Sequence, residues 1–85
     1  MENKSKKFGG NGDMENKSKL FGENLFQLRK ERKFSQQEVA LRIHSSQQCI
    51  SQWEKGITEP TLTYLWRLAD LFEVEVDELI GRKDF

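Results

Sequence analysis

The amino-acid sequence predicts an all-α fold, a compact five-helix bundle, and three observations lead to that prediction. Apolar residues recur at helical spacing from Gly22 onward, capping residues and short polar turns separate these runs, and no stretch alternates with the two-residue period of a strand. The chain has 85 residues, 35% of them hydrophobic, so we expect one small domain. Its single Cys fits a reducing, intracellular setting.

The N-terminal segment contains an imperfect repeat, because MENKSKKFGGN at 1–11 is followed by the similar MENKSKLFGEN at 14–24. It is either a short duplication or an upstream extension, with Met14 as the natural first residue. The Gly-rich stretch between the two copies has the composition of a linker. We therefore expect a disordered extension at 1–21, a folded domain at 22–81 and a short tail at 82–85.

The first two helices follow from periodicity and a capping signal. Leu25 and Leu28 predict a helix over 22–33. Ser35 and Glu38 have the spacing of a capping box, in which each side chain bonds the other residue's backbone N–H. This box predicts a second helix over 36–43, with Val39, Ala40 and Ile43 on its inner face.

Three further helices follow the turn at His44. Ser46 is a good N-cap for a helix over 46–55, which Gly56 ends. Thr61 is expected to cap a fourth helix from Leu62 to Phe72, and a short fifth one runs from about Val76 to Ile80. The expected core of the later helices is Ile50, Trp53, Leu62, Leu65, Leu68, Ala69 and Phe72.

The third helix divides into two unlike faces. At about 100° per residue, its polar side chains fall within roughly 140° of arc, opposite Cys49, Ile50 and Trp53. Three of those polar residues are glutamines, whose amide offers a donor and an acceptor together and so matches adenine in the major groove. A solvated stripe is the alternative, although such a stripe would favour Glu and Lys. The polar face consists of Gln47, Gln48, Ser51, Gln52 and Lys55.

These segments together resemble the Cro/C1-type (XRE) family of helix-turn-helix transcriptional regulators, whose fold is that of the lambda-repressor-like DNA-binding domain. The likeness rests on SQQEVA at 35–40, SQQCISQWEKG at 46–56 and PTL at 60–62, and it covers about Gly22 to Ile80. It implies that the second and third helices form the DNA-reading pair. It also implies a small cytoplasmic repressor of bacterial or phage origin. DNA reading needs a homodimer, because one helix reads only a few base pairs and two related by a twofold axis reach half-sites about 34 Å apart.

The resemblance implies a role for each matching residue. Base reading would fall to Gln47, Gln48, Ser51 and Gln52, and contacts with the DNA backbone to Gln36, Gln37, Ser46 and Lys55. Arg29 and Glu54 match a structural salt bridge between the first and third helices. His44 stands where the family usually has Gly, Ser45 where it has an apolar residue, and Glu73 and Glu75 where it has other capping residues.

The fourth helix carries more apolar residues than one small domain can bury. The excess suggests a self-association surface, with Tyr64, Trp66 and Leu71 as dimer-interface candidates and Phe26 as a further one. The same surface supports an alternative function, in which the chain is an antitoxin or another interaction module. Such a module would hold a toxin-like partner protein through the fourth helix and the C-terminal segment.

Charge and composition narrow the function. Residues 1–22 carry five Lys against three acidic residues, 23–56 carry six basic against four, and 57–85 carry three basic against seven. A polyanion would therefore meet the first two thirds of the chain. We expect no enzyme, no cofactor and no metal site, since His44 and Cys49 lack an orienting third group. The sequence contains no run of about 18 apolar residues, so it predicts no membrane span.

Overall fold

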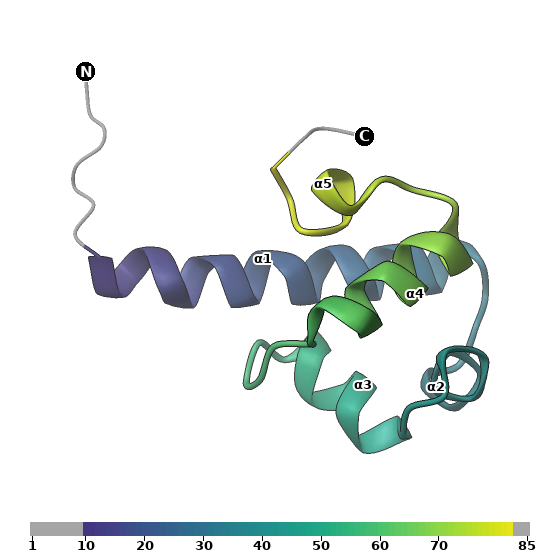
Figure 1. Cartoon of the computed structure of the whole chain (residues 1–85). Coiled ribbons are helices and arrows are strands. Elements are labelled where there is room, and N and C mark those ends of the chain that lie inside the picture. Colours follow the sequence, from purple (N-terminus) through teal and green to yellow (C-terminus); the bar gives the residue numbers. More distant parts are fainter. Residues whose placement is uncertain (1–9, 83–85) are drawn as a thin grey trace.

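The structure is a computed structural model that describes residues 10–82, with side chains described from Lys17 onward. Within that range it consists of five helices and no strand, so the all-helical prediction is confirmed (Figure 1). The helices are α1 (Gly10–Glu31), α2 (Gln36–Ile43), α3 (Gln47–Glu54), α4 (Leu62–Phe72) and α5 (Val76–Leu79).

Helix α1 corrects the expectation for the N-terminal segment. It begins at Gly10 and not at Gly22, so the first helix continues into the segment that was expected to be an extension, while residues 1–9 lie outside the described residues. Packing accounts for the part of this segment next to Gly22: Phe21 lies one turn before Leu25 on the same face, and it is only 4% exposed. One hydrogen bond, 2.6 Å from Ser18 Oγ to Glu59 Oε2, also ties this part of α1 to the loop before α4.

All five helices contribute buried residues to the core. Of the residues expected there, Ile50, Trp53, Leu68, Ala69 and Phe72 are buried and Leu65 is half-buried. Leu62 is 67% exposed, and its assignment to the core is wrong because its side chain lies beside Trp66 on the outer side of α4. The full buried set is Phe21, Leu25, Leu28, Val39, Ala40, Ile43, Ile50, Trp53, Leu68, Ala69, Phe72 and Leu79, with Arg29 as its polar member.

Each of the five described helices is followed by a residue in the left-handed backbone region. The glycines Gly56 and Gly81 have φ of 75° and 86°, and the same conformation occurs at Lys33 (59°), His44 (62°) and Glu73 (59°). In each case the following residue donates to a carbonyl five positions back, as Ile57 does to Gln52 at 3.0 Å. These bonds satisfy carbonyls that the helix end leaves unpaired.

Side chains from neighbouring helices satisfy further end carbonyls. Arg32, directly after α1, donates from Nη2 to the carbonyl of Phe72 at 2.8 Å, and Arg67 of α4 donates from Nη1 to that of Ile43 at 3.1 Å. Asn24 donates from Nδ2 to the carbonyl of Leu79 at 3.2 Å. The ends of α2, α4 and α5 are therefore held by the helices against which they pack.

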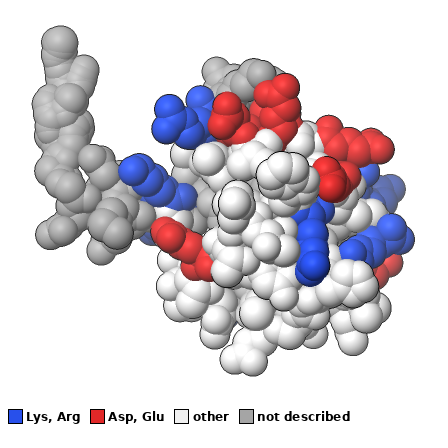
Figure 2. All heavy atoms as spheres, in the orientation of Figure 1, with Lys and Arg blue, Asp and Glu red and all other residues white. Residues whose placement is uncertain are grey.

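Charge is distributed unevenly over the fold. Figure 2 shows acidic side chains gathered at the end where α5 lies, while the opposite end of that face, over α3, is largely uncharged. The acidic residues of this region include Glu73, Glu75, Asp77 and Glu78. Among the described helices, none combines the length and the apolar character needed to cross a bilayer.

Candidate nucleic-acid interface

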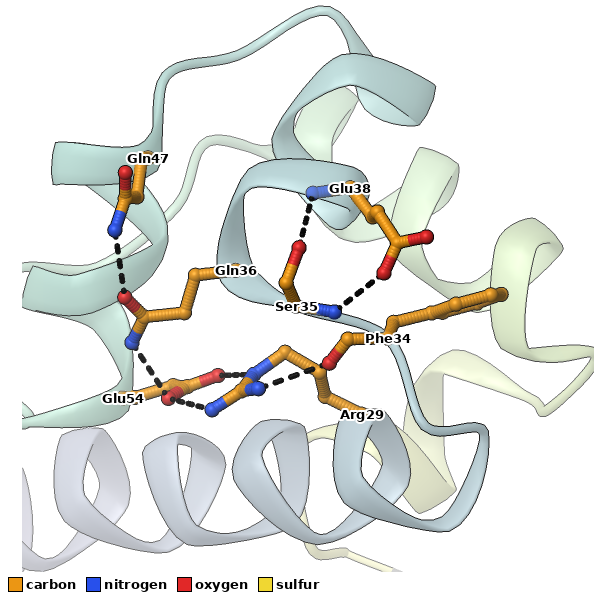
Figure 3. Close-up of polar contacts among 7 residues, drawn as sticks. All are labelled: Arg29, Phe34, Ser35, Gln36, Glu38, Gln47 and Glu54. Carbon is orange, nitrogen blue, oxygen red and sulfur yellow. Dashed lines mark hydrogen bonds and ion pairs between the residues drawn. The ribbon is translucent and has the colours of Figure 1, made fainter.

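Helix α2 begins with the capping box expected from the sequence. The Glu38 backbone N–H donates to Ser35 Oγ at 3.0 Å, and the Ser35 N–H donates to Glu38 Oε1 at 2.7 Å (Figure 3). Two otherwise unpaired amides are satisfied, so the start of the helix is defined at Gln36.

A short turn joins α2 to α3. His44, which stands where the resembled family usually has Gly, adopts the left-handed conformation, and Ser46 caps α3 by accepting a 3.2 Å hydrogen bond from the Cys49 N–H. Two side chains of α4 fix this turn. Tyr64 Oη donates to the His44 carbonyl at 3.2 Å, and Arg67 Nη1 donates to the Ile43 carbonyl at 3.1 Å. Figure 1 shows the two helices crossing steeply and not lying antiparallel.

Arg29 and Glu54 join α1 to α3 through two parallel hydrogen bonds. Arg29 Nε lies 2.6 Å from Glu54 Oε2, and Nη2 lies 3.0 Å from Oε1. Both side chains are nearly buried, at 10% and 7% exposure. The third guanidinium nitrogen donates to the Phe34 carbonyl at 2.9 Å, which holds the loop that leads into α2 (Figure 3).

Gln36 takes part in this network. Its Nε2 donates to Glu54 Oε1 at 3.0 Å, and its Oε1 lies 3.5 Å from Nε2 of Gln47 (Figure 3). The resemblance implied a contact between Gln36 and a backbone phosphate, and in this structure, which contains no DNA, the amide of Gln36 donates to Glu54. The polar contacts thus form one chain. It runs from Arg29 in α1 to Glu54 at the end of α3, then to Gln36 at the start of α2, and finally to Gln47, the first residue of α3.

Gly22 allows α1 to pass close to the end of α3. A Cβ on Gly22 would lie 2.5 Å from the Trp53 carbonyl oxygen and 2.6 Å from that of Glu54. Atoms do not approach so closely, so only a residue without a side chain permits this crossing. Together with the Arg29–Glu54 pair, the close approach sets the position of α3 relative to α1.

The outer face of α3 lines a shallow depression. Gln47, Gln48 and Lys55 are exposed, and Ser51 and Gln52 are half-buried at its sides. Ile57, which the sequence analysis did not single out, completes the lining together with Gln36. Gln37 and Ser46 are also exposed but lie outside that lining. The structure therefore brings all four expected base-reading residues onto one accessible surface.

The thiol of Cys49 lies at the edge of the turn, half-buried. The hydroxyl of Ser46, followed by that of Ser45, lowers the pKa of Cys49 because both donate to the thiolate. Ser45, which replaces an apolar residue of the resembled family, thus contacts the thiol.

The three dimer-interface candidates have different surroundings. Tyr64 is half-buried, with its ring centroid 5.6 Å from that of Trp53, and Leu71 packs against the core. Trp66 is 62% exposed, and Leu62, one turn earlier, is exposed to a similar extent. The accessible apolar surface of α4 therefore consists of Leu62 and Trp66.

Two short helices that cross steeply and are joined by a tight turn are characteristic of the helix-turn-helix class, and here amide side chains face outward from the second helix. Residues 25–79 match the family model described as helix-turn-helix, and the chain belongs to that family. The resemblance to Cro/C1-type regulators is confirmed.

Three curated proteins are similar to the chain. The HTH-type transcriptional regulator AnsR of Bacillus subtilis is 37% identical over 57 residues, which are 67% of this chain and 49% of that protein. The HTH-type transcriptional activator BcrR of Enterococcus faecalis is 33% identical over 58 residues, 68% of this chain and 28% of that protein. The uncharacterized HTH-type transcriptional regulator y4dJ of Sinorhizobium fredii is 39% identical over 58 residues, 68% of this chain and 75% of that protein.

The chain therefore spans about half the length of the Bacillus subtilis relative and less of the Enterococcus faecalis one. The fold is also similar to the crystal structure of the restriction-modification controller protein C.AhdI from Aeromonas hydrophila. That match has a TM-score of 0.71 at 25% identity and covers 75% of this chain and 97% of the other.

Proposed function

We propose that the protein is a sequence-specific regulator of transcription that binds double-stranded DNA through α3. The observation that carries the proposal is the outer face of α3, on which Gln47, Gln48, Ser51 and Gln52 line one accessible depression. An α-helix fits the major groove, and glutamine amides match the N6 and N7 atoms of adenine. The similarity to proteins named as transcriptional regulators supports the same function.

Contacts with the DNA backbone would position this helix. Lys55 is exposed at the end of α3, and Gln37 and Ser46 are exposed at the starts of α2 and α3. The N-terminus of a helix favours a phosphate because its free amides and its dipole face the anion. The acidic residues near α5 lie on the opposite side of α1 from α3 in Figure 1, so they would stay away from the phosphates.

We further propose that two copies bind a palindromic operator. One α3 reads only a few base pairs, whereas two copies related by a twofold axis reach successive turns of the major groove. Leu62 and Trp66 provide an exposed apolar surface for self-association, with 67% and 62% exposure. Occupation of an operator excludes other proteins sterically, so repression is the mode that DNA binding alone produces.

Selection of bound duplexes from a random pool tests this function. The expected product is an inverted repeat with half-sites about one helical turn apart, bound less tightly as salt rises because phosphate contacts release counterions. Recovery of no enriched sequence would overturn the proposal.

A second function rests on the exposed apolar pair of α4. In that case Leu62 and Trp66 hold a different protein, as in an antitoxin with its toxin. Co-purification of a distinct small protein that is lost in Trp66→Glu supports this function. A parent protein that only self-associates, and a Trp66→Glu variant that is monomeric, would support the homodimer instead.

A further inference from the structure

Ile57 is an exposed apolar residue within an otherwise polar depression. It is 66% exposed, and its neighbours in the lining are four glutamines, one serine and one lysine. It lies three positions beyond Glu54, the last residue of α3, whereas Gln47 is the first residue of that helix. The surface that we assign to DNA therefore has an aliphatic group at the end opposite Gln47.

The backbone at Ile57 is held in place by its surroundings. Gly56 has φ of 75°, its N–H donates to the Trp53 carbonyl at 3.1 Å, and the Ile57 N–H donates to the Gln52 carbonyl at 3.0 Å. A Cβ on Gly56 would lie 3.2 Å from Cα of Lys19, so α1 supports the turn from its other side. Ile57 is thus presented by an ordered turn that α1 and α3 both contact.

The packing that usually accompanies such a turn is missing. At helix ends of this type, an apolar residue in this position frequently packs back onto the last turn of the helix. Here the last turn offers the polar residues Ser51 and Gln52, and the Ile57 side chain stays outside the core. Its apolar surface is available to a ligand of the depression.

We propose that Ile57 is a specificity residue that contacts the 5-methyl group of a thymine at the Lys55 end of each half-site. The thymine methyl is the apolar group on the base edges of the major groove, and aliphatic side chains contact it. Amide groups read the polar edges nearer Gln47, and Ile57 reads the methyl beyond them. This inference rests on the proposed function and adds one base preference to it.

Deoxyuridine provides a direct test, because it keeps every hydrogen-bonding group of thymine and lacks only the methyl. In the selected operator each thymine is replaced in turn by deoxyuridine, and the Kd is measured at fixed salt for the parent, Ile57→Ala and Leu41→Ala. Leu41 is a matched control, since it is 71% exposed on α2 and does not line the depression.

We expect one replacement per half-site to weaken parent binding roughly fourfold for each lost methyl contact. Ile57→Ala should bind the thymine duplex about as weakly as the parent binds the deoxyuridine duplex, and it should not distinguish the two. Leu41→Ala should keep the parent's preference.

Three results would overturn the inference while leaving DNA binding intact. The parent could be insensitive to every replacement, or Ile57→Ala could keep the parent's sensitivity. Ile57→Ala could also weaken all sequences equally, which would assign the contact to deoxyribose. Recovery of no bound sequence at all is different, because it overturns the proposed function as well.

Discussion

The amide nitrogen of Gln36 donates a 3.0 Å hydrogen bond to Oε1 of Glu54, the same oxygen that accepts from Nη2 of Arg29. One carboxylate thereby joins α1, α2 and α3 at a point where little water reaches it, since the Glu54 side chain is only 7% exposed. The orientation of the two helices that form the candidate interface depends on this group.

Removal of either member of the ion pair should destabilise the fold strongly. Arg29→Met leaves the Glu54 carboxylate without its main partner, and loss of one member of a buried pair costs about 3–5 kcal/mol. Urea unfolding measures the free energy of unfolding of Arg29→Met, Glu54→Leu and the double variant. The double variant should lose clearly less than the sum of the two single losses. Additive losses would show that the pair is not coupled.

Gly22→Ala should destabilise the protein by about 2–3 kcal/mol, because its Cβ would meet the Trp53 carbonyl oxygen at 2.5 Å and α1 would have to move away from α3. Glu23→Ala is the control: it is exposed on the same helix, so its effect should stay within about 0.5 kcal/mol. Thermal unfolding compares the two variants. Equal melting temperatures would contradict the close approach of these helices.

Lys33→Gly should stabilise the protein. Lys33 has φ of 59°, a conformation that disfavours any residue with a Cβ, and glycine adopts it without strain. The larger freedom of glycine in the unfolded chain offsets part of the gain, so we expect about 0.5–1 kcal/mol. Lys30→Gly, inside α1, should have the opposite sign and lose about 1 kcal/mol. Chemical denaturation of both variants checks this reversal.

Gln47→Ala and Gln48→Ala should each lose about 1–3 kcal/mol of discrimination at one base pair per half-site. The measurement compares the Kd for the selected operator with the Kd for single-position variants of it. Gln27→Ala supplies a glutamine truncation on α1, outside the depression, and should bind as the parent does. If both α3 variants treat operator and random duplex as the parent does, the face assigned to base reading is wrong.

The thiol of Cys49 should react with iodoacetamide at a lower pH than an ordinary cysteine. The hydroxyls of Ser46 and Ser45 stabilise the thiolate, which lowers the pKa of Cys49. Ser45→Ala removes one of these donors without removing the Ser46 cap of α3, so the midpoint of the rate–pH profile should rise. An unchanged midpoint would assign no role to Ser45.

Several parts of the fold could be predicted because neighbouring residues alone determine them. The Ser35–Glu38 box, the Ser46 cap and the Gly56 turn join groups a few positions apart, and they occur where the sequence places them. The burial of Phe21 and the exposure of Leu62 were mispredicted, because each depends on which distant helix covers the side chain. The contribution of Ile57 to the depression could not be predicted either, because an isolated apolar residue in a loop gives no periodic signal.

The order of the residues by itself determined five helices, their caps and an amide-rich face on the third, because periodicity and capping are local properties of the chain. Only the tertiary structure decided that Phe21 is buried, that Gln36 turns toward Glu54, and that the exposed apolar surface of α4 is Leu62 with Trp66. These outcomes depend on contacts between segments far apart in the sequence. Such contacts are made only after the helices have packed against one another.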